Sequence, residues 1–182
     1  MALLLGLGAS ALWLVILRLS DRAPGRGPWP PRRGNLFTAI WAWGLTTCLY
    51  LGLVQTWGQP SVLPGLLRNG IGLPLAIAGS VLHTWATATL GLKGTSGWDV
   101  GVTTGGPYAL CRHPQYLGQI ASLAGIALWI GSTQSLVLGL AASGVLLYGS
   151  AVEDRALADR HRAAFAAYRA RTPFLVPAVS RP

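Results

Sequence analysis

Charged residues are scarce in this 182-residue sequence, and their scarcity excludes an ordinary soluble domain. They make up 10% of the chain, and only five of them are acidic. A typical soluble protein carries about 25% charged residues. Because hydrophobic residues make up 52% of the chain, the composition predicts an integral membrane protein.

Cysteine is also scarce, with Cys48 inside an apolar run and Cys111 in a polar stretch. Two distant cysteines exclude a disulfide framework and the paired-cysteine signature of zinc and iron–sulfur sites, so no metal is expected. The formal net charge of +9 could suggest a nucleic-acid ligand. The basic residues flank hydrophobic runs, however, where anionic lipid head groups are the nearer partner, and we expect no nucleic acid to bind.

Five apolar runs approach the length of a bilayer span: residues 2–19, 36–54, 71–92, 116–132 and 135–152. The connections between them are too short for a soluble nucleotide-binding domain, since each βαβ unit needs about 30 residues. The sequence therefore predicts an all-α polytopic protein, a single membrane domain with about five transmembrane helices over residues 1–182. Any chemistry has to be carried out by the helices and their edges.

The distribution of arginine predicts the orientation of the chain in the membrane. Residues 20–35 hold four arginines and the tail after residue 152 holds six, whereas residues 55–70 hold only Arg68. The positive-inside rule then places the C-terminus and the connections 20–35 and 93–115 in the cytoplasm, with the N-terminus outside. The first run could be a signal peptide, but its positive residues follow the apolar stretch, which favours a retained span.

Polar residues concentrate in the glycine-rich connection 93–115, which ends near Arg112-His113-Pro114. Pro114 fits the first turn of the next helix, and the partial positive charge of that helix N-terminus adds to Arg112 and His113. This arrangement favours a carboxylate or phosphate ligand. The alternative is that Arg112 is a topology anchor and His113 an interfacial residue, with the glycines forming a flexible connector.

Two of the five acidic residues, Glu153 and Asp154, are adjacent at the predicted cytoplasmic end of the fifth span. Two carboxylates beside a hydrophobic span are costly unless they bind something cationic. We expect them to face Arg112 and His113 across the hairpin of the fourth and fifth spans and to form a site for a zwitterion. The alternative is a helix-end pair neutralised by the arginines that follow it.

Two further features lie outside this hairpin. His83 is an ionisable residue inside the third span, which makes it a functional candidate by default, although a neutral histidine bonded to a backbone carbonyl would be structural. The tail after residue 152 has an apolar face and an arginine-rich face, which predicts an amphipathic interfacial helix that Pro173 ends. The tail helix either anchors the chain to anionic head groups or closes over the site.

Four motifs follow one another in a recognisable order: GPY at 106–108, RHPQYLG at 112–118, the acidic pair at 153–154, and Phe165-x-x-Tyr168 followed by FLVP at 174–177. This order, over about residues 90–177, resembles the integral-membrane S-adenosylmethionine-dependent methyltransferases, the family of isoprenylcysteine carboxyl methyltransferase and phospholipid N-methyltransferase. The segment LGLKGT at 90–95, followed by Asp99, is similar to the LGxxGTxxxD segment of phosphatidylethanolamine N-methyltransferases, which the isoprenylcysteine enzymes lack.

The resemblance implies S-adenosylmethionine as cofactor and a membrane phospholipid as acceptor, namely phosphatidylethanolamine and its methylated intermediates. The residues expected to hold the cofactor are Gly106, Pro107, Tyr108, Arg112, His113, Tyr116, Gly118, Glu153 and Asp154. The residues expected at the substrate are His83, Gly94, Thr95, Trp98 and Arg112. The attacking amine must be neutral, and the candidate catalytic bases are Asp99, His113 and Glu153.

Three other functions are compatible with parts of the sequence. A carboxyl or thiol methyltransferase of the isoprenylcysteine type would act on a lipophilic acceptor, and a carboxylate acceptor needs no base. A non-catalytic lipid-binding protein would explain each motif separately. A sterol-type reductase shares a similar RHPxY stretch, but its membrane core has more spans than the five expected here.

Overall fold

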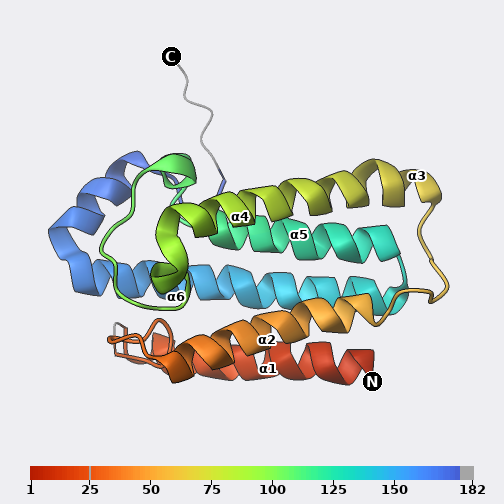
Figure 1. Cartoon of the computed structure of the whole chain (residues 1–182), viewed down its shortest axis with the longest axis horizontal. Helices are drawn as coiled ribbons and strands as arrows, with labels where there is room; N and C mark the ends of the chain where they lie inside the picture. The colour runs from red at the N-terminus through yellow and green to blue at the C-terminus, as the bar shows by residue number, and fades with distance from the viewer. Residues whose placement is uncertain (25, 177–182) are drawn as a thin grey trace, which may run out of the picture.

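The computed structural model describes residues 1–24 and 26–176, and all regular elements in these ranges are helices (Figure 1). Five long helices build the fold: α1 (Ala2–Asp21), α2 (Leu36–Val54), α4 (Leu73–Thr95), α5 (Pro114–Ile130) and α6 (Thr133–Arg171). Three short elements accompany them: α3 (Gly65–Leu67), the π-helical turn η1 (Arg68–Gly72) and the 3-10 turn η2 (Gly106–Ala109). The prediction of an all-α chain is confirmed, and each apolar run corresponds to one long helix. Pro177, the last residue of the FLVP motif, lies outside the described residues.

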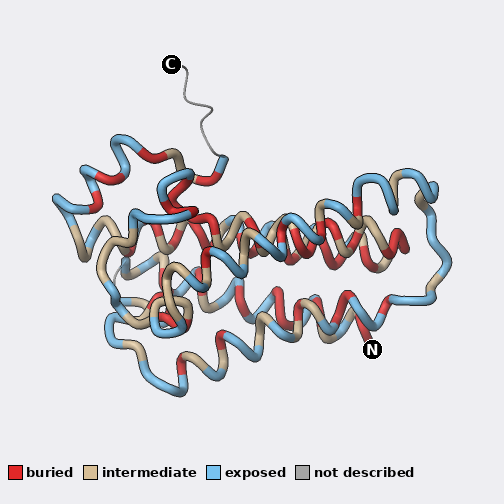
Figure 2. Tube along the Cα trace, turned by 45° about the horizontal axis from the view of Figure 1, so that its top comes forward, coloured by how far each residue is buried: buried red, intermediate tan, exposed pale blue. Residues whose placement is uncertain are grey.

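Four stretches of helix are long and apolar enough to cross a membrane: α1, α2, the continuous stretch Gly65–Thr95, and α6. The protein is therefore an integral membrane protein. The fifth helix, α5, has 17 residues, so it is only about 25 Å long against a hydrocarbon core of about 30 Å. A fifth span stays a prediction. Large apolar side chains such as Leu4 and Leu140 are about 80% and 78% exposed, as helix faces turned towards lipid require (Figure 2).

The helices pack in the order α2, α1, α6, α5, α4, with each helix against the next. The contact between α4 and α5 depends on small residues, as the spacing of Gly118 and Ser122 predicts. A Cβ atom at Gly118 would lie 2.5 Å from the backbone nitrogen of His83, so only glycine fits there. Ser122 hydrogen-bonds Ser80 across the same contact, with 2.9 Å between the hydroxyl oxygens. Close backbone approach thus fixes α5 against α4.

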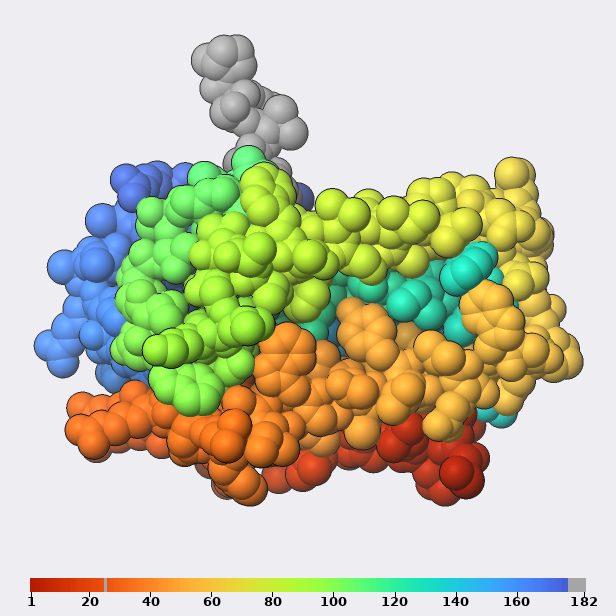
Figure 3. Space-filling model, in the orientation of Figure 1, coloured from red at the N-terminus to blue at the C-terminus, as the bar shows by residue number. Residues whose placement is uncertain are grey.

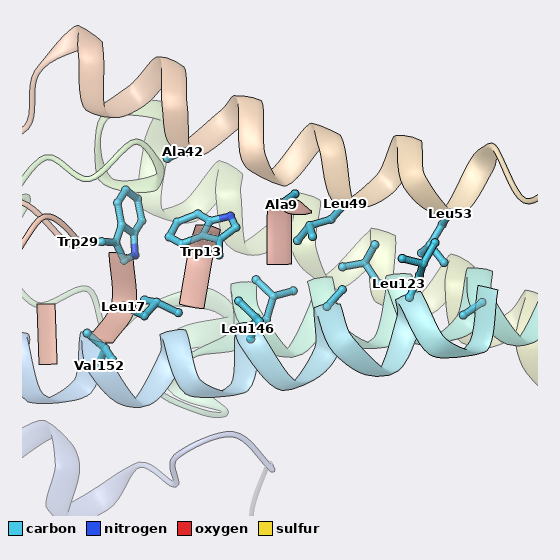
Figure 4. Packing of buried hydrophobic residues seen from close by; sticks show 14 residues of the cluster. Ala9, Trp13, Leu17, Trp29, Ala42, Leu49, Leu53, Leu123, Leu146 and Val152 are labelled. Atoms are coloured by element: carbon cyan, nitrogen blue, oxygen red, sulfur yellow. The ribbon is translucent and has the colours of Figure 1, made fainter. Parts of the chain in front are cut away.

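Aromatic residues fill the core between α1 and the helices around it (Figure 4). Trp13 of α1 lies edge-on to Trp29 and Trp41, with ring centroids 5.5 Å and 5.3 Å apart. Leu17 and Leu49 are almost fully buried beside them. The aromatic core therefore joins the N-terminal helices to the rest of the bundle.

Three segments gather at one end of the bundle: the connection 22–35, the connection 96–113 and the last part of α6 (Figure 1). We call this the site end. Two bends bring the segments together. Gly91 has φ +78°, a value that side chains disfavour, and there the last turn of α4 leaves the helix axis. Arg162 interrupts α6 with φ +28°, after which the chain turns back over the site end.

The residues after 152 are helical: α6 continues to the interruption at Arg162, and a second stretch of helix follows it. It ends at Arg171, two residues before Pro173, as expected. Beyond the bend, Phe165 and Tyr168 are buried and the arginines are exposed. Packing of this part against an interface is still a prediction.

Candidate active site

The basic and acidic pairs meet at the site end, where α5 begins and α6 leaves the bundle. Arg112 donates from Nε to Oδ1 of Asp154 over 2.8 Å and from Nη2 to Oδ2 over 3.4 Å. His113 Nε2 lies 2.9 Å from the same Oδ1. Nη1 of Arg112 donates to the carbonyl of Thr172, and the Arg112 amide donates to that of Pro173. The side chains of Arg112, His113 and Asp154 are all buried, so the cluster joins α5, α6 and the chain after α6.

The expected role of His113 as a base stays a prediction, and the structure places its ring against Asp154 and Phe174. The His113 ring is 2% exposed, lies edge-on to Phe174 at 5.2 Å, and lines neither of the two cavities described below. Asp154 also lines neither cavity. In this structure His113 and Asp154 contact Arg112 and the start of α5, and neither lines a cavity. A zwitterion site that includes these two residues stays a prediction.

Glu153 lies differently from its neighbour Asp154, since adjacent residues of a helix point about 100° apart. Its carboxylate accepts a hydrogen bond from the Tyr116 hydroxyl at 3.0 Å. That hydroxyl in turn accepts from the indole Nε1 of Trp29 at 3.1 Å. Within the described residues, Glu153 forms no ion pair, and Arg155 pairs instead with Asp21 of α1 at 2.7 Å. Arg155 thus does not pair with Glu153.

A first cavity of about 680 Å³ lies between the long helices. Its walls are mostly apolar or aromatic, with Trp13 from α1, Trp43 from α2 and Leu146 from α6. Polar side chains also reach it, among them His83 and Gln119. No lysine or arginine of the described chain lines this cavity.

A second cavity of about 640 Å³ lies under the connection 96–113 and the last part of α6. Its lining is polar and of mixed charge, with Asp99 and Glu153 as anions and Arg112 and Arg160 as cations. The aromatic side chains of Trp29, Trp98, Tyr108 and Tyr168 complete it. A pocket with both charges and several aromatic rings suits a zwitterion that carries a flat base.

The two cavities are adjacent, because four residues line both: Trp29, Leu90, Gly94 and Glu153. We call this shared wall the junction. Leu90 and Gly94 flank the bend at Gly91, so the LGLKGT segment forms part of the shared wall. Glu153 is the only ionisable residue among the four. A ligand in either cavity could thus reach the same carboxylate.

The last part of α6 forms hydrogen bonds with the connections 22–35 and 96–113 beside the second cavity. His161 Nε2 lies 3.0 Å from Oδ1 of Asp99, which also accepts from the Gly101 amide. Arg160 donates to the carbonyl of Pro30. The Tyr168 hydroxyl donates to the carbonyl of Tyr108 at 2.6 Å. The tail thus closes over the cavity.

Of the residues expected at the cofactor, Tyr108, Arg112 and Glu153 line the second cavity, and Tyr116 lines the first beside Glu153. Burial, and then the negative charge of Glu153, raise the pKa of Tyr108 well above its usual range, so its hydroxyl stays neutral. Gly106 and Pro107 shape the turn η2 that carries Tyr108 and line neither cavity.

Gly118 was expected at the cofactor, and the structure places it against α4 instead, where it is a packing residue.

The residues expected at the substrate divide between the two cavities. His83 and Thr95 line the first, Trp98 lines the second, and Gly94 lines both. His83 Nδ1 lies 3.2 Å from the carbonyl oxygen of Gln115. This backbone contact is the one expected if His83 has a structural role. Asp99 lies at the rim of the second cavity, held by His161, away from the junction. Of the three candidate bases, the structure places only Glu153 at the junction.

The sequence did not indicate that residues of the N-terminal half of the chain line the first cavity. Trp13, Trp29, Trp43 and Thr46 line the first cavity, although the motifs begin near residue 90. Tryptophans in and near apolar runs are common membrane anchors, so their residue type carried no signal. Gln119 could have been found, because it is a polar residue within a predicted span and lies one helical turn after Gln115.

The family model described as phospholipid methyltransferase matches residues 67–163 of the chain. This stretch includes the bend of α4, the start of α5 and Glu153, and it covers more than half of the chain. The chain belongs to the phospholipid methyltransferase family. It is therefore a member of a family of membrane methyltransferases, as the resemblance implied.

One relative of this chain is the cobalt-zinc-cadmium resistance protein CzcN of Cupriavidus metallidurans. It is 34% identical over 130 residues, which are 68% of this chain and 55% of the relative. The chain thus spans little more than half the length of that protein. No solved structure matches the chain. In the part of the chain that the structure describes, no three His, Cys, Asp or Glu side chains gather as metal ligands would.

Proposed function

We propose that this protein transfers a methyl group from S-adenosylmethionine to the amine head group of a phospholipid, namely phosphatidylethanolamine and its methylated intermediates. The observation that carries the proposal is the meeting of two cavities of different chemistry at Glu153. A reaction between a water-soluble donor and a lipid acceptor needs two such compartments. The two compartments must also be adjacent, so that the amine of the lipid can reach the methyl group of the donor.

The second cavity fits the donor by its chemistry. Arg112 and Arg160 would face the carboxylate of the methionyl end, Asp99 or Glu153 its ammonium, and the aromatic rings its adenine. When bound, the donor would supply a methyl group on a cationic sulfonium. Aromatic faces and a carboxylate stabilise such a cation, and Trp29 and Glu153 lie where the cavities meet. The tail and the connection 96–113 would exclude water from this cavity.

The first cavity fits an amine better than a carboxylate. Its charged lining residue is Glu153, and no lysine or arginine of the described chain reaches it. A carboxylate acceptor would therefore face a like charge with no cation to pair with. An ammonium would instead pair with Glu153. The lining thus supports a lipid amine over the carboxyl acceptor of the isoprenylcysteine type.

Glu153 is the proposed base for the acceptor. The amine must lose a proton before it can attack, and a carboxylate within hydrogen-bond reach can hold the ammonium and accept that proton. The hydrogen bonds from Trp29 to Tyr116 and from Tyr116 to Glu153 fix the carboxylate at the junction. Positioning of the amine in a site shielded from water would supply most of the remaining rate.

The lipid would enter sideways from the bilayer. Figure 3 shows a hollow between α2 and α4, with α5 visible at its floor. Trp43 of α2 and His83 of α4 line the first cavity from these two sides. Beside the hollow, Trp43 Nε1 donates to Ser96 Oγ at 2.9 Å and joins the two walls. The arginine-rich connection 22–35 lies at the site end, so we propose that this end faces the cytoplasm.

The test is incubation of the purified protein in detergent with methyl-labelled S-adenosylmethionine and vesicles that contain phosphatidylethanolamine. Label in mono-, di- or trimethylated phosphatidylethanolamine is the expected result. Binding of the donor with label only in an added prenylated carboxylate or hydrophobic thiol would favour the alternative acceptors. Failure to bind the donor at all would contradict the proposal.

A further inference from the structure

The last turn of α4, residues 92–95, forms part of the junction. Gly94 in this turn lines both cavities, as does Leu90 just before the bend at Gly91. A single helical turn is not stable by itself, because its few backbone hydrogen bonds do not offset the cost of ordering it. Packing at the bend does not hold the turn, since no other segment comes within 4 Å of where a Gly91 Cβ would lie. Side chains of other helices therefore have to hold it.

Gln115 of α5 bridges the bend. Its side-chain Nε2 donates to the hydroxyl of Thr87, before the bend, over 2.9 Å and to the hydroxyl of Thr95, after the bend, over 3.1 Å. Trp43 of α2 donates to Ser96 at the end of the turn. Within the described residues, Gln115 is the side chain that hydrogen-bonds α4 on both sides of the bend. It thus fixes the last turn relative to the long part of the same helix.

The next residue of α5, Tyr116, holds the opposite wall of the junction. Adjacent residues of a helix point about 100° apart. Gln115 therefore faces α4, while Tyr116 reaches α6 and donates from its hydroxyl to Glu153 over 3.0 Å. Both residues lie in the first turn of α5, directly after the buried charged cluster that joins α5 and α6. One turn of α5 thus fixes the two sides of the junction relative to each other.

We propose that Gln115 is a positioning residue for methyl transfer, which sets the spacing between the wall at Gly94 and the carboxylate of Glu153. The inference rests on the proposed function, because it takes donor and acceptor to meet at the junction. In that reaction the bond from nitrogen to the methyl carbon forms as the bond to sulfur breaks and leaves its electron pair on sulfur. The three atoms have to be in line, and a displacement of about 1 Å costs up to about a hundredfold in rate.

The decisive variant is Thr87→Val, because Thr87 lines neither cavity and valine keeps its shape while it removes the hydroxyl. The bridge then has only one end, so kcat should fall about tenfold or more, and the affinity for S-adenosylhomocysteine should change less than kcat. Gln115→Met keeps the length of the side chain and removes both hydrogen bonds, so it should lower kcat at least as much. Thr84→Val is the matched control: the Thr84 hydroxyl donates to the carbonyl of Ser80 in its own helix, and kcat should stay unchanged.

A double variant separates a bridge from two independent hydrogen bonds. If the bridge works as a unit, Gln115→Met should have little further effect on kcat once Thr87→Val has broken it. Hydrogen exchange gives a second measurement that needs no turnover. The amides of Ser96 and Gly97 bond to carbonyls of the last turn of α4, so they should exchange faster in Thr87→Val and Gln115→Met but not in Thr84→Val.

Wild-type kcat in both Thr87→Val and Gln115→Met, or effects on kcat that multiply in the double variant, would overturn the positioning role of Gln115. A wild-type protein without methyl transfer would contradict the proposed function instead. In that case faster exchange at Ser96 and Gly97 in the two variants would still support the bridge, and unchanged exchange would overturn it.

Discussion

Neutralising Asp154 should lower the stability of the fold, whereas neutralising the adjacent Glu153 should remove activity. Asp154 holds Arg112 and His113 in a buried cluster, whereas Glu153 faces the two cavities and accepts one hydrogen bond from Tyr116. Asp154→Asn should therefore destabilise the fold. Glu153→Gln should leave the fold nearly intact and remove methyl transfer.

The loss of stability expected for Asp154→Asn can be estimated from the contacts of Asp154. An asparagine keeps one carbonyl oxygen, so at least one of the charge-assisted hydrogen bonds is lost and the Arg112 charge loses its partner. Each such bond contributes about 1.5–3 kcal/mol, and removing a partner of a buried pair costs about 3–5 kcal/mol. A loss of about 3 kcal/mol corresponds to a fall in Tm of roughly 6–12 °C for a chain of this size.

The assay is thermal unfolding in one detergent, combined with methyl transfer measured well below each Tm. Asp159→Asn is the matched control, because Asp159 lies on the same helix and is exposed, and it should change neither property. The reasoning would be refuted by a normal Tm for Asp154→Asn, or by a Glu153→Gln protein that is as unstable as Asp154→Asn or fully active.

Three further substitutions test single contacts. Arg112→Lys keeps the charge but cannot bond Asp154 through two nitrogens and Thr172 through a third, so Tm and activity should both fall. Gly91→Ala should lower Tm by a few degrees and reduce activity because φ +78° is unfavourable with a side chain, whereas Gly144→Ala, with no atom near its Cβ, should be neutral or slightly stabilising. Tyr116→Phe removes the donor to Glu153 and the acceptor of the Trp29 indole, so kcat should fall about tenfold and Tm by a few degrees, and unchanged kcat would show that this hydrogen bond does not position the base.

The sequence was sufficient to predict the long helices, because each apolar run has to find its backbone hydrogen bonds within itself in a membrane. It did not predict the bend at Gly91 or the bend at Arg162. These depend on packing at the site end. Local residue types do not specify such contacts.

The sequence predicted which charged residues come together at the site, but not which of them face the cavities. Charge and spacing brought Arg112, His113 and the acidic pair to one place, and the structure joins them there. Which carboxylate faces the cavities depends on the rotation of α6, which a pair of adjacent acids does not reveal. Gly118 lies both in the RHPQYLG motif and in a small-residue spacing with Ser122, and the structure shows its close packing against His83.

The measurement that tests the account most directly is an experimental structure of the protein with S-adenosylhomocysteine and phosphatidylethanolamine. The account predicts the nucleoside in the cavity lined by Tyr108 and Arg112, and the lipid between α2 and α4 with its amine beside Glu153. A nucleoside bound between the long helices, or a lipid amine away from Glu153, would contradict it.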